Sequence, residues 1–335
     1  MSQVEAYEAE SAVAIVMNPW TGAVLALVSL PDFDPDNFSN ASEDTLRNRA
    51  VTDPFEPGSI FKPVVTALAL DFQVIGYDEK IFCENGYYGA YRIGEYGNRK
   101  YGNMTARQIL VNSSNIGMAK IGLKMQKQKL YEGVRLFGFG ARTGIDLPAE
   151  DPGLLKPVRE WSGYTPTRIP FGHEISVTAL QIVRAYCILA NGGRAVRPHL
   201  VRMRIEGSEN VVESQPSTNL PGYVIKPATA NWIVREVLTG VVNEGTGKKA
   251  AIEGIKVFGK TGTANIAGSS QKGYDETNYV ASFVGGAPAE KPEVIILVSI
   301  RKPNKALGKG YTGGTVAAPV FREILKKTLT YLRQG

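Results

Sequence analysis

Strand-like sequence lies at both ends of this 335-residue chain, and helix-like sequence fills its middle. Two apolar, β-prone runs at residues 13–17 and 23–30 flank the turn-forming residues 18–22, which predicts a β-hairpin. Three more strand-like runs follow near the other end, at residues 257–262, 280–284 and 294–300. This pattern predicts an α/β protein of the α+β type, with an antiparallel sheet assembled from both ends of the chain and a helical insertion between them.

Helical spacing of apolar residues marks six further segments. They are residues 59–72, 105–110, 116–126, 176–189, 228–242 and 316–332. Pro63 falls near the first turn of the first segment, where a missing N–H costs least. Residues 83–101 and 138–170, rich in Gly with Tyr or Pro, are expected to be mostly loop.

The formal net charge of +6 is compatible with nucleic acid, an anionic membrane or acidic substrates. Lys and Arg are scattered, and no zinc-finger spacing or basic run is present, so nucleic acid is not an expected partner. With two histidines in the chain, neither a histidine-rich metal site nor a cofactor is expected. Cys83 and Cys187 are predicted to be buried and unpaired. No apolar run of about 18 residues and no charged leader is present, so the chain as given is expected to be soluble and without an export signal.

Three short motifs follow one another along the chain, and each alone is weak evidence. They are Ser59-Ile60-Phe61-Lys62, Ser113-Ser114-Asn115 and Lys260-Thr261-Gly262-Thr263. Together they read S-x-x-K, S-x-N and K-T-G-T, which describes a serine nucleophile with amine and hydroxyl partners and a cationic strand.

The first motif supplies a nucleophile and a base. A serine hydroxyl is a poor nucleophile until a base removes its proton. Ser59 and Lys62 are three residues apart at the start of a predicted helix, so they share one face and Lys62 is expected to reach the Ser59 oxygen. To act as a base, Lys62 must be neutral, and burial together with a second cation such as Lys260 lowers its pKa.

The second motif lies on a predicted turn between two helices, where it can face a cleft. Ser113 is suited to relaying a proton between Lys62 and a leaving amine, and Asn115 to hydrogen bonding both Lys62 and a substrate amide. The alternative is ordinary turn chemistry, since Ser and Asn are common turn formers.

The third motif lies on a predicted strand along which an extended peptide can add as a further strand. The Lys260 charge and the Thr261 and Thr263 hydroxyls suit a C-terminal carboxylate. Gly262 leaves room for another backbone, and the N–H groups of Ser59 and Thr263 are expected to form an oxyanion hole.

The same region also matches the phosphate-binding pattern G-x-x-x-x-G-K-[ST] between Gly254 and Thr261. A phosphate-binding loop follows a strand and opens a helix. Here the middle residues are themselves strand-like and no helix is expected after Thr261, so the sequence argues against this alternative.

On these motifs the chain resembles the transpeptidase domain of class B penicillin-binding proteins, the cell-wall cross-linking enzymes of bacteria. The resemblance runs from about Ala12 to Leu332 and is greatest to the division and sporulation branch. Other matching stretches are residues 48–50, 56–59, 172–178, 190–193, 245–247 and 313–320.

The resemblance implies the penicillin-binding, β-lactamase-like fold with an all-helical subdomain and an active site between the two parts. The sheet would come from about residues 12–30 and 255–335, and the helical subdomain from about 60–240. The family also has a membrane anchor and an N-terminal pedestal domain. Residues 1–11 would then be the remnant of a linker to that domain, and residues 12–335 the transpeptidase domain on the outer face of the bacterial inner membrane.

The activity implied is D,D-transpeptidation of peptidoglycan stem peptides ending in D-Ala-D-Ala, through a serine acyl-enzyme that β-lactam antibiotics also form. Ser59, Lys62, Ser113 and Asn115 would be catalytic, and Lys260, Thr261, Gly262 and Thr263 would bind substrate. Membrane division or elongation proteins would bind through regions outside this sequence. The alternatives are a serine β-lactamase, whose class A type needs an E-x-x-L-N loop that the sequence lacks, and a non-catalytic β-lactam sensor.

Overall fold

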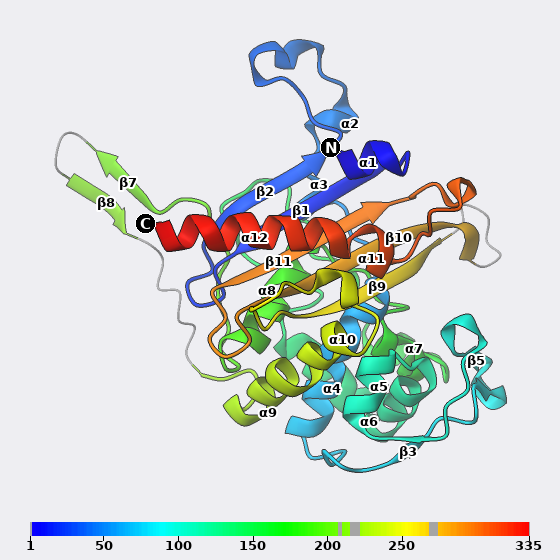
Figure 1. Cartoon of the computed structure of the whole chain (residues 1–335). Helices are drawn as coiled ribbons and strands as arrows, with labels where there is room; N and C mark the ends of the chain where they lie inside the picture. The colour runs from blue at the N-terminus through cyan, green and yellow to red at the C-terminus, as the bar shows by residue number, and fades with distance from the viewer. Residues whose placement is uncertain (1, 207–209, 215–221, 268–273, 335) are drawn as a thin grey trace.

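The structure is a computed structural model that describes residues 2–206, 210–214, 222–267 and 274–334. Its centre is a five-stranded antiparallel sheet with strand order β2-β1-β11-β10-β9 (Figure 1). The strands are β1 Ser11–Met17, β2 Val24–Leu30, β9 Phe258–Ala267, β10 Tyr274–Ala287 and β11 Val294–Arg301. The predicted fold class is confirmed.

The central strand β11 is buried on both faces because helices cover the sheet on both sides. Ile295 and Leu297 join the larger hydrophobic core, which includes α8 (Ala179–Ala190). Ile296 and Val298 point the other way, into a second cluster with α12 (Ala318–Gln334), the helix that crosses the front of the sheet in Figure 1. Burial of each such side chain contributes about 1.5–3 kcal/mol, which explains the almost unbroken apolar run of this strand.

Most other helices pack together on the side of the sheet that carries α8. They are α4 Lys62–Asp71, α5 Ala106–Asn112, α6 Asn115–Leu136, α7 Thr165–Arg168, α9 Pro227–Trp232 and α10 Thr239–Asn243, with the π-helical segment Ile233–Leu238 joining the last two. Four further short helices are α1 Ser2–Ala6, α2 Glu43–Leu46, α3 Arg49–Thr52 and α11 Gly313–Val316.

The segment expected to be irregular, residues 83–101, contains a short strand pair, β4 (Tyr87–Tyr88) with β5 (Ile93–Gly94). A second short pair, β3 (Ile81–Phe82) with β6 (Asn103–Met104), flanks the segment. A separate pair, β7 (Met203–Glu206) with β8 (Asn210–Ser214), lies outside the central sheet.

Two predicted helices differ from the observed ones. Residues 59–72 divide into a 3₁₀ turn, Gly58–Phe61, followed by α4. The helix expected to end at residue 126 has a break in its backbone there, because Gln126 adopts φ 63° and ψ 163°, but α6 continues beyond it to Leu136.

Residues near the N-terminus pack against the sheet. Tyr7 is buried in the α12 cluster, and Glu10 pairs with Arg301, the last residue of β11, and with Lys302. The division into a linker remnant, residues 1–11, and a transpeptidase domain stays a prediction. Cys83 and Cys187 are buried and unpaired, as expected.

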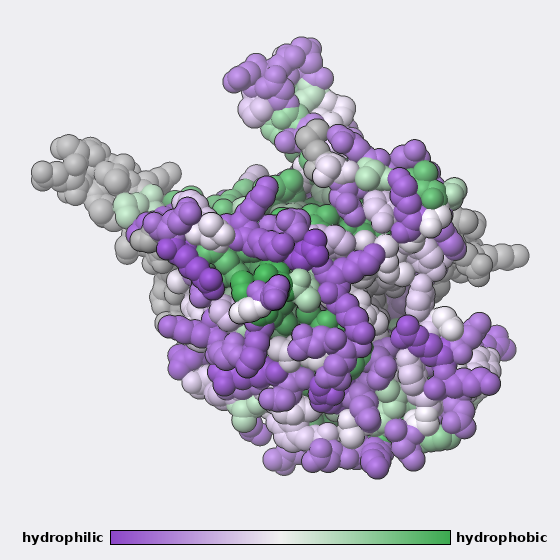
Figure 2. Space-filling view, in the orientation of Figure 1, coloured by the Kyte–Doolittle hydropathy of each residue, from purple (hydrophilic) through white to green (hydrophobic). Residues whose placement is uncertain are grey.

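The surface seen in the orientation of Figure 1 is mainly hydrophilic, with hydrophobic residues gathered in a band just below α12 (Figure 2). Within the described residues, no helix is both long enough and apolar enough to cross a membrane.

Candidate active site

Ser59 lies on the 3₁₀ turn that leads into α4, and Lys62 is the first residue of that helix. Neighbouring elements hold this turn in place. The fully buried Tyr186 of α8 donates a hydrogen bond to Ile60 O at 2.9 Å, and Gly58 N donates to Gly172 O at 3.1 Å. The backbone that presents Ser59 is therefore fixed from two sides, while the Ser59 side chain lines an open cleft.

Gly172 is required where its loop crosses the Ser59 turn. Its φ is +83°, and a Cβ built there would lie 2.2 Å from Gly58 O. Both the left-handed conformation and the close approach exclude a side chain. The segment 172–178, singled out in the sequence, therefore packs directly against the Ser59 turn.

Lys62 is fully buried and points at the second motif. Its Nζ donates to Ser113 O at 2.6 Å and to Asn115 Oδ1 at 2.7 Å, and it lies 3.2 Å from Ser113 Oγ. Burial lowers the pKa of Lys62 to about 7, and the Glu95 carboxylate partly opposes that shift. A lysine with such a pKa exists in both protonation states near neutral pH.

Lys260, on β9, is the second fully buried lysine of the site. Its Nζ donates to Ser113 Oγ at 3.0 Å and to Thr261 O at 3.1 Å. Burial and then the Lys62 charge lower the pKa of Lys260 well below its ordinary value. The Ser113 hydroxyl thus lies within hydrogen-bond distance of two buried amines.

The second motif joins two helices. Ser113 ends α5 in the left-handed conformation, with φ 59°, and Ser114 caps α6 by accepting a hydrogen bond from Gly117 N. Asn115 is the first residue of α6. The sharp reversal between the helices directs Ser113 and Asn115 toward Lys62.

The third motif lies on β9, which pairs with β10 on one side and forms the open edge of the central sheet. Thr261 Oγ1 lies 2.6 Å from Thr246 Oγ1, and Gly313 N donates to Thr263 Oγ1 at 3.1 Å. An edge strand has unpaired backbone N–H and C=O groups, to which a peptide in the cleft can pair.

Gly262 was expected to make room for a substrate backbone, but the neighbour it accommodates is the protein itself. A Cβ at Gly262 would lie 2.9 Å from Ile60 Cγ2 and 3.3 Å from Pro57 O. The glycine therefore lets β9 lie against the turn that carries Ser59.

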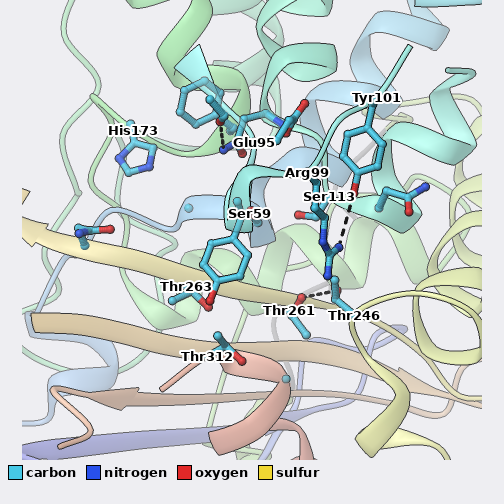
Figure 3. Close-up of a pocket in the computed structure, with 18 residues that line it drawn as sticks. Ser59, Glu95, Arg99, Tyr101, Ser113, His173, Thr246, Thr261, Thr263 and Thr312 are labelled. Atoms are coloured by element: carbon cyan, nitrogen blue, oxygen red, sulfur yellow. Dashed lines mark hydrogen bonds between the residues drawn. The ribbon is translucent and has the colours of Figure 1, made fainter. Parts of the chain in front are cut away.

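These residues surround one cleft of about 480 Å³. In Figure 3, Thr261, Thr263 and Thr312 lie on one side of it, and Glu95, Arg99 and Tyr101 on the other. The cleft is lined by Gly58, Ser59, Gly94, Glu95, Tyr96, Arg99, Tyr101, Asn112, Ser113, Asn115, Phe171, His173, Thr246, Thr261, Thr263, Asn265, Thr312 and Gly314.

The sequence matches the penicillin binding protein transpeptidase domain over residues 12–326. This chain belongs to that family. The transpeptidase domain also resembles curated proteins: it is 34% identical over 330 residues to stage V sporulation protein D of Bacillus subtilis, covering 97% of this chain and 50% of that protein. It is also 33% identical over 319 residues to the peptidoglycan D,D-transpeptidase FtsI of Escherichia coli, covering 95% of this chain and 51% of that protein. The chain thus spans about half the length of these relatives.

Solved structures of the family have the same fold as the transpeptidase domain. The transpeptidase domain of Burkholderia pseudomallei penicillin-binding protein 3 matches with a TM-score of 0.83 at 30% identity, covering 99% of this chain and 91% of that one. Penicillin binding protein 3 of Mycobacterium tuberculosis, complexed with aztreonam, matches with a TM-score of 0.89 at 28% identity, covering 99% and 75%. The prediction of the family is confirmed.

The transpeptidase domain brings all three motifs together, with one difference from the expected geometry. Lys62 N donates to Ser59 O within the turn, but among the described residues no hydrogen bond joins the Ser59 hydroxyl to Lys62 Nζ; the three acceptors of Lys62 Nζ lie on Ser113 and Asn115. Hydrogen bonds of a catalytic base often tighten only when substrate is bound. The phosphate-loop alternative is wrong, because β9 continues through Thr261 to Ala267, where a phosphate-binding loop would open a helix.

Several cleft residues of the transpeptidase domain were not predicted. Glu95, Arg99 and Tyr101 come from the segment expected to be irregular, and His173, whose Nδ1 lies 2.7 Å from Glu56 Oε2, from the loop beside the Ser59 turn. Residues 83–101 are rich in Gly and Tyr and show no helical or strand periodicity of apolar residues, so the sequence did not predict where these side chains would lie. No group of three or more His, Cys, Asp or Glu suited to a metal occurs among the residues described.

Proposed function

We propose that this chain is the catalytic domain of a peptidoglycan D,D-transpeptidase that β-lactams inhibit covalently. One observation carries the proposal: the Ser113 hydroxyl lies 3.2 Å from Lys62 Nζ and 3.0 Å from Lys260 Nζ in the cleft that Ser59 lines. This arrangement links a base, a proton relay and a cation beside one nucleophile. The names of relatives such as FtsI, a peptidoglycan D,D-transpeptidase, support the same reaction.

In the proposed reaction, neutral Lys62 accepts the Ser59 proton as Ser59 Oγ attacks the penultimate D-Ala carbonyl of a donor stem peptide. The N–H groups of Ser59 and Thr263 bind the developing oxyanion. The peptide C–N bond then breaks, and Ser113 passes the proton from Lys62 to the departing D-Ala amine. The amine of a second stem peptide then attacks the acyl carbonyl, the ester bond to Ser59 Oγ breaks as the cross-linking amide forms, and the amine proton returns through Lys62 to Ser59 Oγ.

The donor would lie along the open edge of β9, with its C-terminal carboxylate near Lys260, Thr261 and Thr263. That carboxylate stabilises the ammonium form of Lys260, since a nearby opposite charge favours the charged form. Lys260 then carries the positive charge of the pair while Lys62 stays neutral. Asn115 would orient both Lys62 and the substrate amide.

The cellular setting belongs to the same proposal. The relatives FtsI and stage V sporulation protein D support a role in the bacterial cell envelope, in division or sporulation. We propose that the domain works at the outer face of the inner membrane, in a longer protein that also binds membrane division or elongation proteins.

The proposal is tested by the lifetime of the penicillin adduct. Penicillin mimics the D-Ala-D-Ala donor, but its leaving amine stays tethered, so we expect an acyl-enzyme at Ser59 that survives for at least minutes. Mass spectrometry of the intact protein after penicillin treatment, followed by peptide mapping, measures both lifetime and position. Turnover of penicillin many times per second would indicate a β-lactamase. A stable adduct without cross-linking or thioester turnover would indicate a sensor.

A second prediction concerns Gly262→Ala. The added Cβ meets Ile60 and Pro57, so the Ser59 turn must move away from β9. We expect a loss of stability of about 1–3 kcal/mol and a fall of about tenfold to a hundredfold in the rate of acylation. Chemical denaturation and stopped-flow labelling with a fluorescent penicillin measure the two effects.

The matched control for that substitution is Gly163→Ala, because no atom lies within 4 Å of the Cβ position of Gly163. It should acylate at the parent rate. Parent-like acylation in Gly262→Ala would mean that the contact between β9 and the Ser59 turn does not set the position of the nucleophile.

A further inference from the structure

Glu95 lies outside the three motifs but contacts the middle one directly. We propose that Glu95 is a positioning residue, which holds the Ser113-Ser114-Asn115 turn against Lys62 and supplies a negative charge to that buried lysine. This inference rests on the proposed function, because it concerns the geometry and charge of the acylating site.

The Glu95 carboxylate binds the start of α6. It is 6% exposed and immediately follows β5. Glu95 Oε1 accepts hydrogen bonds from Ser114 Oγ at 2.5 Å and Ile116 N at 3.3 Å, and Oε2 accepts from Asn115 N at 2.7 Å. Three donors on consecutive residues therefore converge on one carboxylate, at the helix end where negative charge is favoured.

The same segment orients the Asn115 side chain. Asn115 Nδ2 donates to Gly94 O at 3.1 Å, so the amide oxygen faces Lys62 Nζ at 2.7 Å. The backbone of Asn115 is bound by Glu95 and its side chain by the residue before Glu95. Movement of Glu95 would thus displace an acceptor of the proposed base.

The charge of Glu95 matters because Lys62 and Lys260 are both fully buried. Two charged groups face Lys62: Lys260 on β9, and Glu95 between β5 and α6. The effects on the pKa of Lys62 are burial, which lowers it, and the Glu95 carboxylate, which raises it.

The contacts of Glu95 leave its charge available to act on Lys62. In the described part of the chain, no Lys or Arg forms an ion pair with Glu95; its partners are one hydroxyl and two backbone N–H groups. Hydrogen bonds to neutral donors stabilise the ionised carboxylate without cancelling its charge.

The test is the pH profile of acylation by a fluorescent penicillin in Glu95→Gln. The amide has one oxygen, so it cannot accept all three hydrogen bonds, and it carries no charge. We expect the plateau rate at high pH to fall about tenfold to a hundredfold. We also expect the rising limb of the profile to move to lower pH, because removal of a nearby negative charge lowers the pKa of Lys62.

Two further variants separate charge from position. Glu95→Asp keeps the charge on a side chain one methylene shorter. The plateau rate of acylation should therefore fall, while the rising limb of the pH profile stays near that of the parent. Glu84→Gln is the matched control: Glu84 lies in the same segment but pairs with Lys120 of α6, and both limb and plateau should be unchanged.

The outcomes are decisive for the inference. If the rising limb of the pH profile does not move in Glu95→Gln, the charge role is overturned. If the plateau rate of acylation is unchanged in Glu95→Asp, the positioning role is overturned, and this second result holds even if Glu95→Gln fails to fold. The parent domain, measured alongside, separates this inference from the proposed function. A parent that takes no label contradicts both, whereas a labelled parent with parent-like Glu95 variants contradicts the inference alone.

Discussion

Replacing Ser59 with alanine is expected to abolish covalent labelling by penicillin and leave the domain folded. The hydroxyl that would form the ester is removed. Ser59 is half-buried at the edge of the cleft, so loss of one oxygen leaves no sizeable cavity in the core. Mass spectrometry after penicillin treatment and a thermal unfolding scan measure the two expectations.

The control for Ser59→Ala is Ser39→Ala, which changes an exposed serine outside the cleft and should label like the parent. Labelling of Ser59→Ala at another serine, at the parent rate, would contradict the assignment of the nucleophile. A variant that failed to unfold cooperatively would show a structural role for Ser59 that its contacts do not indicate.

The strands at the two ends of the chain were predictable because their apolar runs are long and bounded by turn residues. The run at residues 294–300 became β11, buried on both faces, and residues 13–17 became most of β1. The bounds of β9 and β10 were harder to predict. Their pairing extends beyond the apolar positions, since Thr263 pairs with Ala281 and Asn265 with Tyr279.

The turn that carries Ser59 shows what local periodicity misses. Apolar spacing predicted one helix over residues 59–72. In the structure, Gly58–Phe61 form a 3₁₀ turn and the α-helix begins only at Lys62. Gly172, Gly262 and Tyr186 fix that turn, and all three are distant in sequence. Tertiary contacts of this kind override helix propensity at a site where a side chain must be presented.

The motifs identified the groups of the site but not how they are arranged. Spacing placed Ser59 and Lys62 on one face, yet the hydrogen bonds of Lys62 go to Ser113 and Asn115. Glu95 was missed because it lies 20 residues before Asn115 in a segment without helical or strand periodicity. The sequence predicted that burial and Lys260 together lower the pKa of Lys62. In the structure, burial is the main cause of that lowering.

The final prediction concerns Lys62 as the base, and its first part is a pH dependence. The pKa of Lys62 is lowered from its ordinary value to about 7, so the amine is mostly protonated below pH 7 and mostly neutral above it. Only the neutral amine can accept the Ser59 proton. The acylation rate should therefore rise with pH through a single ionisation near 7 and then level off, well below the ordinary lysine range of about 10.4.

Lys62→Arg should be nearly inactive at every pH in that range. Arginine keeps its positive charge and its donors toward Ser113 and Asn115, but it cannot give up a proton under these conditions. The change also places a larger cation in a fully buried position next to Lys260, so the fold of the variant must be checked by unfolding.

Lys62→Met supplies the neutral, unbranched control: it removes the base without adding charge and should be equally inactive. Stopped-flow acylation of all three proteins across the pH range measures the effect. A Lys62→Arg variant that acylates near the parent rate would show that the proton of Ser59 goes elsewhere.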